Sequence, residues 1–182
     1  GNLKAIKDYI EAEKFDLRIQ SFCRGDRRKA ISFAEFRAIC RAMTSCKYII
    51  LDDFYGLTST MKLRDGQKLI QLWHGSGAFK KFGYSRLEAD MNPRVVHSGY
   101  RKYTGALVSA EGVRECFAEA FGISVDKVKA LGSPRSDMLF DDEFKSESKS
   151  KLISAFPELN GKKIILFAPT YRGDRVEAAN YD

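Results

Sequence analysis

Cysteine pairs and histidines are scarce in this chain of 182 residues, and their scarcity argues against metal chemistry. The four cysteines, Cys23, Cys40, Cys46 and Cys116, include no Cys-x-x-Cys pair, and only two histidines could join them as ligands. We therefore predict no zinc site. We interpret the four thiols as reduced, as in a cytosolic protein, with three of them acting as small apolar residues in apolar or helical surroundings.

Long apolar runs and known nucleotide-binding glycine loops are also absent. The longest runs, such as 48–51 and 164–168, are far shorter than the roughly 20 residues that a spanning helix needs, so we expect any membrane association to be peripheral. Gly75-Ser76-Gly77 is not a dinucleotide fingerprint, because Lys80 stands where that motif needs its third glycine. No Walker A pattern occurs either, which argues against ATP hydrolysis of the P-loop kind.

The charge balance is basic and the composition is that of a folded protein. The net charge is +7, and 44% of the residues are hydrophobic. A basic surface favours nucleic acid, anionic lipid or phosphorylated substrates without choosing among them, and it also fits a soluble protein with an ordinary charge excess. The lysines and arginines do not form a stripe interleaved with aromatic residues, so we predict no nucleic-acid partner.

Helical and strand-like segments alternate along the chain. We predict helices at 2–13 with Asn2 as N-cap, at 32–44 with a Ser32–Glu35 capping box, at 111–121 stopped by Gly122, and at 142–155. We predict strands at 15–22, 48–51, 68–73, 106–109, 127–131 and 163–168. This alternation is typical of an α/β fold, a parallel sheet with helices on both faces.

Polar or turn residues follow five of the predicted strands. They are Asp52-Asp53, His74-Gly75, Ser109–Glu111, Gly132–Arg135 and Pro169–Arg172. Ligands of parallel sheets bind beyond the carboxyl ends of the strands. We therefore expect the functional site at this edge.

His74 is the candidate catalytic residue, because the end of the strand at 68–73 would hold its imidazole in a fixed place. An imidazole can take a proton from a hydroxyl group near neutral pH, and Asp52 or Asp53 could orient it. The alternative is a core histidine satisfied by a backbone carbonyl. Gly75 and Gly77 on either side of Ser76 would let a substrate come close, whereas Ser76 is too near His74 along the chain to read as a triad nucleophile.

Basic and hydroxyl side chains near the other strand ends are candidates for phosphate binding: Lys80, Arg135, Thr170 and Arg172. Each has a structural alternative. Lys80 and its neighbour Lys81 could be solvated, Arg135 could pair with Asp137, and Thr170 and Arg172 could form an interdomain contact. The second histidine, His97, has no evident partner in the sequence and is interpreted as structural.

Three of these segments together resemble the CDP-glycerol glycerophosphotransferase family, the teichoic acid primases and polymerases of Gram-positive bacteria. The segments are Gln71-Leu-Trp-His-Gly-Ser-Gly-Ala-Phe-Lys-Lys-Phe-Gly83, Leu131-Gly-Ser-Pro-Arg-Ser-Asp137 and Ile164-Ile-Leu-Phe-Ala-Pro-Thr-Tyr-Arg172. Their order and spacing match the successive signatures of the family. The resemblance extends over nearly the whole chain from about residue 30.

The resemblance implies a Rossmann-like parallel sheet that forms the amino-terminal half of a two-domain transferase of GT-B type. We expect an acceptor-side domain at 1–160, which carries the Trp-His-Gly motif with the catalytic His74. Residues 161–182 would begin a donor-binding domain that this chain truncates. Family members carry a further histidine and donor-binding residues in that second domain, so we expect this chain to be inactive alone.

The implied reaction moves glycerol phosphate, or ribitol phosphate in relatives, from CDP-glycerol to a hydroxyl group of a polyprenyl-diphosphate-linked acceptor, releasing CMP. The resemblance places the enzyme in the cytoplasm at the inner face of the cell membrane. It leaves open the polyol, the acceptor, primase or polymerase action, the need for a divalent metal and the oligomeric state. The rival hypotheses are another GT-B nucleotide-sugar transferase and a non-catalytic basic module that docks on anionic membrane.

Overall fold

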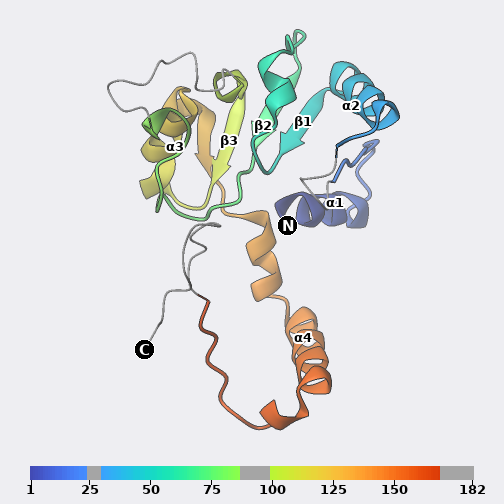
Figure 1. Ribbon diagram of the computed structural model, residues 1–182, viewed down its shortest axis with the longest axis vertical. Coiled ribbons are helices and arrows are strands. Elements are labelled where there is room, and N and C mark those ends of the chain that lie inside the picture. The colour runs from blue at the N-terminus through green and yellow to red at the C-terminus, as the bar shows by residue number, and fades with distance from the viewer. Residues whose placement is uncertain (24–29, 87–98, 169–182) are drawn as a thin grey trace. The chain divides into compact units, whose positions relative to one another are not determined.

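The computed structural model, which describes residues 1–23, 30–86 and 99–168, contains a parallel four-stranded sheet (Figure 1). Its strands are β1 (Tyr48–Leu51), β2 (Lys68–Gln71), β3 (Gly105–Val108) and β4 (Val128–Ala130), in the order β1-β2-β3-β4. All three pairings are parallel. The predicted α/β fold with a parallel sheet is confirmed, and the carboxyl ends of the strands share one edge.

Two predicted strands are wrong. Residues 15–22 have no strand conformation, and their aromatic and aliphatic side chains Phe15, Leu17 and Phe22 are largely exposed. Residues 163–168 are likewise not a strand, and Ile165 is 87% exposed. An apolar run becomes a strand only when a neighbouring strand takes its backbone hydrogen bonds, and the described residues offer neither segment such a neighbour.

The helices are α1 (Asn2–Ala12), α2 (Phe33–Ser45), α3 (Arg114–Phe121) and α4 (Asp142–Ala155). The predicted Ser32–Glu35 capping box is present at the start of α2, and α3 ends at Gly122 with a left-handed φ of 63°. The predicted N-cap role of Asn2 is wrong. Gly1 occupies the N-cap, and the buried Asn2 side chain bonds to residues far along the chain.

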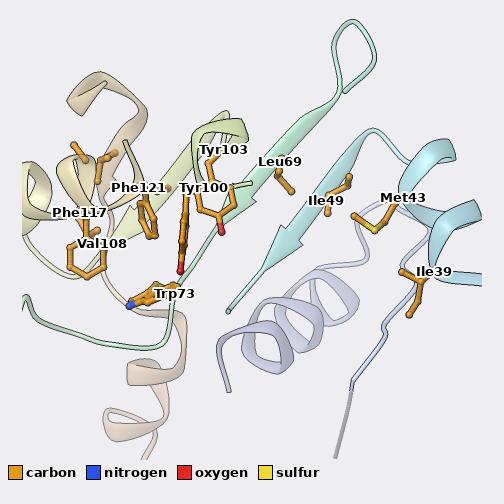
Figure 2. Close-up of a cluster of buried hydrophobic side chains, with 13 residues drawn as sticks. Ile39, Met43, Ile49, Leu69, Trp73, Tyr100, Tyr103, Val108, Phe117 and Phe121 are labelled. Carbon is orange, nitrogen blue, oxygen red and sulfur yellow. The ribbon is translucent and has the colours of Figure 1, made fainter. Parts of the chain in front are cut away.

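Aromatic side chains form the core at the carboxyl end of β2. The Trp73 ring stacks on Phe82 with centroids 4.4 Å apart and meets Phe121 edge-on at 5.5 Å. Figure 2 shows Tyr100, Tyr103 and Phe121 gathered near Trp73. Because Trp73 is anchored in this cluster, the residue that follows it starts from a fixed position.

The chain divides into two compact units, Gly1–Met138 and a second one that starts at Leu139. The first unit holds the sheet and the aromatic cluster. Of the second, the structure describes α4, a short 3-10 helix at Pro157–Leu159 and an exposed apolar segment at 163–168. The predicted domain boundary near residue 161 stays a prediction.

The cysteines are free thiols, and none of them is fully buried. Cys40 and Cys46 are half-buried, whereas Cys23 and Cys116 are exposed. The expectation that three of the four act as buried hydrophobic residues is therefore wrong, because two are exposed; Cys40 and Cys46 fit it only in part.

Candidate active site

His74 projects from the carboxyl edge of the sheet beside the end of β1. Its Nδ1 atom lies 3.8 Å from Oδ1 of Asp53 and 3.3 Å from the backbone carbonyl oxygen of Asp52. The His74 side chain is 55% exposed, so it is not a core histidine. Of the two predicted orienting residues, Asp53 supplies the carboxylate and Asp52 supplies its carbonyl group.

This environment selects one tautomer of the imidazole. Both groups near Nδ1 are hydrogen-bond acceptors, so a proton on Nδ1 is favoured. The lone pair of a neutral imidazole then resides on Nε2. On this partly exposed side chain, an Nε2 atom with a lone pair can accept a proton from a hydroxyl group that docks beside it.

The Asp53 carboxylate is itself held in place. Its Oδ1 accepts a hydrogen bond from the backbone N–H of Phe54 at 2.7 Å. The carbonyl of Asp53 accepts a second one from Nε2 of Gln71 at 3.1 Å. The ends of β1 and β2 are thus tied together at the point where the carboxylate and the imidazole meet.

Trp73, immediately before His74, has an unusual backbone conformation. Its φ of 56° lies in the left-handed region, where a bulky residue is a genuine outlier. Its N–H donates to Oε1 of Gln71 at 2.8 Å, and its carbonyl accepts from Nδ2 of Asn2 at 2.7 Å. Its ring stacks on the His74 imidazole with centroids 4.5 Å apart.

Arg135 lies beside His74, as expected for two residues at the same edge of the sheet. Its contact is with the backbone of His74. Its Nη2 donates to the carbonyl oxygen of His74 at 2.6 Å, in place of the suggested pairing with Asp137. The turn that carries it is fixed because the Ser133 hydroxyl and the Arg135 N–H both donate to Oδ1 of Asn2, each at 3.1 Å. The guanidinium group therefore lies at the backbone of His74, with further N–H donors of its own.

The loop after His74 is open. Gly75 and Ser76 are exposed, and the Ser76 carbonyl accepts a hydrogen bond from the hydroxyl of Ser109 at the end of β3. A Cβ atom at Gly77 would lie 2.5 Å from the ring of Phe79, which itself is 91% exposed. Gly77 therefore makes room for the Phe79 ring, and the predicted gap for a substrate next to the imidazole stays a prediction.

Lys80 and Lys81 are exposed in the same loop, and neither has an ion-pair partner among the described residues. The structure therefore brings Lys80 into the His74 loop without linking it to the imidazole. Thr170 and Arg172, like His97, lie outside the described residues. A group of three side chains suited to hold a metal ion is absent from residues 1–23, 30–86 and 99–168.

None of the helices that the structure describes is both long and apolar enough to cross a bilayer.

The sequence did not point to three residues that support the site through buried hydrogen bonds. They are Asn2, Gln71 and Tyr103. Gln71 is fully buried and also donates to the hydroxyl of Tyr103 at 2.9 Å. Burial raises the pKa of Tyr103 far above its usual value, so the phenol stays neutral. A glutamine in the apolar run 69–73 was a visible signal, because an amide buried in a strand must find partners.

A protein-family model matches residues 2–182, and it is described as CDP-Glycerol:Poly(glycerophosphate) glycerophosphotransferase. A teichoic acid poly(ribitol-phosphate) polymerase of Bacillus spizizenii is 39% identical over the whole chain, which covers 29% of that relative. The teichoic acid ribitol-phosphate polymerase TarK of Staphylococcus aureus is 38% identical, again over the whole chain and 36% of the relative. A teichoic acid glycerol-phosphate primase of Staphylococcus aureus is 29% identical over 75% of the chain and 38% of the relative.

Solved structures of the wall teichoic acid polymerase TagF have the same fold. One matches with a TM-score of 0.66 at 19% identity, over 94% of this chain and 44% of that one. Another, a variant soaked with CDPG, matches with a TM-score of 0.56 at 18% identity, over 72% of this chain and 33% of that one. The chain spans about a third of the length of the curated relatives that it matches. With a family model matched from residue 2 to residue 182, the chain belongs to the CDP-glycerol:poly(glycerophosphate) glycerophosphotransferase family.

Proposed function

We propose that the full-length protein carrying this chain transfers a polyol phosphate from a CDP-linked donor to a hydroxyl group of a lipid-linked acceptor in teichoic acid synthesis. The observation that carries the proposal is the His74 imidazole, exposed at the carboxyl edge of the sheet with Nδ1 facing Asp53. Family membership and the teichoic acid polymerases and primases among the relatives support the reaction class.

His74 acts as the general base of this reaction. Its Nε2 takes the proton of the acceptor hydroxyl, and the acceptor oxygen attacks the phosphorus atom that bears the polyol. A new phosphorus–oxygen bond forms, the bond to the CMP phosphate oxygen breaks, and CMP leaves. Asp53 keeps the proton on Nδ1 and stabilises the imidazolium that forms.

Cationic side chains near His74 hold the phosphate charge. Phosphoryl transfer depends on positioning and charge stabilisation, and Arg135 is the first candidate because its guanidinium group donates to the His74 backbone. Lys80 in the open loop is a second donor to phosphate, and Thr170 and Arg172 are further candidates. Gly75, Ser76 and Gly77 leave the gap through which the acceptor hydroxyl approaches.

The polyol is glycerol or ribitol. We predicted CDP-glycerol from the resemblance, and the family description carries that donor, but the curated relatives include ribitol-phosphate enzymes at 38–42% identity as well as glycerol-phosphate primases at 29–34%. These relatives make CDP-ribitol an equal candidate. The donor domain, proposed to begin near residue 161 in a GT-B arrangement, selects between them.

The test is CMP release by the full-length protein with CDP-glycerol, CDP-ribitol and a UDP-sugar, in the presence of a lipid-linked acceptor at a membrane surface. Release from one of the two CDP-polyols supports the proposal. Turnover of the UDP-sugar alone would instead indicate another GT-B transferase. Vesicle binding without any turnover would indicate a docking module on the cytoplasmic face of the membrane.

A further inference from the structure

We propose that Asn2 and Gln71 are positioning residues whose side-chain amides clamp the backbone of Trp73, so that His74 is delivered to Asp53. The catalytic part of this inference rests on the proposed function. The clamp itself is a statement about conformation, which can be tested without turnover.

The clamp is needed because Trp73 occupies a conformation that it does not favour. At a φ of 56°, the tryptophan Cβ crowds its own backbone, and only tight surroundings keep a bulky residue there. Strained residues of this kind cluster at functional sites. Trp73 directly precedes the proposed base, so its φ sets the direction in which the chain enters His74.

Both polar backbone groups of Trp73 are held by side-chain amides. Oε1 of Gln71 accepts from the Trp73 N–H at 2.8 Å, and Nδ2 of Asn2 donates to the Trp73 carbonyl at 2.7 Å. The two amides come from distant parts of the sequence: Gln71 belongs to β2, whereas Asn2 belongs to α1 and precedes Trp73 by 71 positions. Asn2 is 3% exposed and Gln71 is fully buried, so little water competes for these bonds.

Each amide also reaches a second part of the site. Gln71 donates to the carbonyl of Asp53 at 3.1 Å, which fixes the residue that faces the imidazole. Asn2 accepts from the N–H of Arg135 at 3.1 Å, which fixes the turn whose guanidinium holds the His74 carbonyl. The two amides therefore set the relative positions of the proposed base, its carboxylate and the nearest cation.

The conformational test uses the single tryptophan of the chain as its probe. Trp73 is 9% exposed, so its fluorescence in the 182-residue chain should be blue-shifted and poorly quenched by acrylamide. We expect Asn2→Ala to shift the emission to the red and to raise the quenching constant about twofold. Alanine is a strong helix former, so α1 should persist, and far-ultraviolet circular dichroism checks this.

Asn2→Asp separates the clamp from a merely structural role. The carboxylate keeps an acceptor for Ser133 and Arg135 but has no N–H for the carbonyl of Trp73. We expect Asn2→Asp to change the Trp73 emission as Asn2→Ala does. If Asn2 only tied α1 to the turn that carries Arg135, Asn2→Asp would leave this emission unchanged. Should Asn2→Ala fail to fold, Asn2→Asp alone decides. Lys4→Ala, an exposed change on the same helix, is the matched control.

The catalytic test measures CMP release by the full-length protein. We expect both Asn2 variants to lower kcat about tenfold, because the base is displaced. Asn2→Asp keeps the acceptor for Ser133 and Arg135, so it should leave KM for the donor within twofold. An unchanged kcat, or an unchanged Trp73 emission in both Asn2 variants, would overturn the inference. If the wild type releases no CMP from any donor, the proposed function fails, and the Trp73 emission still decides whether the clamp exists.

Discussion

Replacing the buried Gln71 with alanine should strongly destabilise the first compact unit, Gly1–Met138. It removes three hydrogen bonds at once: to the Trp73 N–H at 2.8 Å, to the Tyr103 hydroxyl at 2.9 Å and to the Asp53 carbonyl at 3.1 Å. Leaving a buried polar group without its partner costs about 1–3 kcal/mol.

The three losses share one cavity, into which a water molecule can enter, so their costs do not add in full. We expect the free energy of unfolding to fall by about 3 kcal/mol, with a further small contribution from the lost side-chain volume. Urea unfolding followed by circular dichroism measures this change. The control is Gln20→Ala, which truncates an exposed glutamine and should stay within about 0.5 kcal/mol of the wild type. A loss below about 1 kcal/mol for Gln71→Ala would refute the reasoning, because it would mean that the network adds nothing.

Three further changes test separate parts of the structure. Asp53→Asn should lower kcat for CMP release about tenfold, whereas Asp52→Asn should have little effect because Asp52 offers only its carbonyl to His74; equal losses would contradict the pairing. Gly122→Ala should lower the free energy of unfolding by about 1–2 kcal/mol, since φ is 63° and the new Cβ would lie 2.9 Å from the Tyr84 ring; urea unfolding checks this, and an unchanged midpoint would contradict it. Burial raises the pKa of Tyr103 above that of a tyrosine in the unfolded chain, which begins to ionise at about pH 10. The stability that comes from keeping the phenol neutral is therefore full below about pH 10 and is lost as the pH rises towards the folded pKa. The free energy of unfolding should therefore fall above about pH 10, and the fall should be shallower in Tyr103→Phe; parallel pH profiles would show that another group is responsible.

The sheet could be predicted from the sequence because its strands carry their signal locally. The runs that became β1 and β2 are apolar, short and closed by polar residues, so pattern and structure agree. Residues 163–168 contain a similar apolar run and residues 15–22 alternate apolar and polar side chains, yet neither segment is a strand. Pairing with a neighbour decides between the two outcomes, and a local pattern does not contain the neighbour.

The site could be predicted in outline for a related reason. Parallel strands bring their carboxyl ends to one edge, which is why His74, Asp53 and Arg135 could be expected near each other. The way in which they are connected could not be expected. Asn2 looks like a helix cap on local grounds, but its amide bonds to residues more than 70 positions away, and only the folded chain brings them together.

The central claim is that His74 is the base that activates the acceptor hydroxyl. The most direct measurement is CMP release by the full-length protein, with CDP-glycerol and CDP-ribitol in turn, for the wild type, His74→Ala and the exposed control Lys4→Ala. We predict that His74→Ala lowers kcat by at least about 100-fold, the usual size of general-base catalysis, while circular dichroism shows an unchanged fold and the control keeps its rate. A folded His74→Ala protein that releases CMP at the wild-type rate would contradict the account.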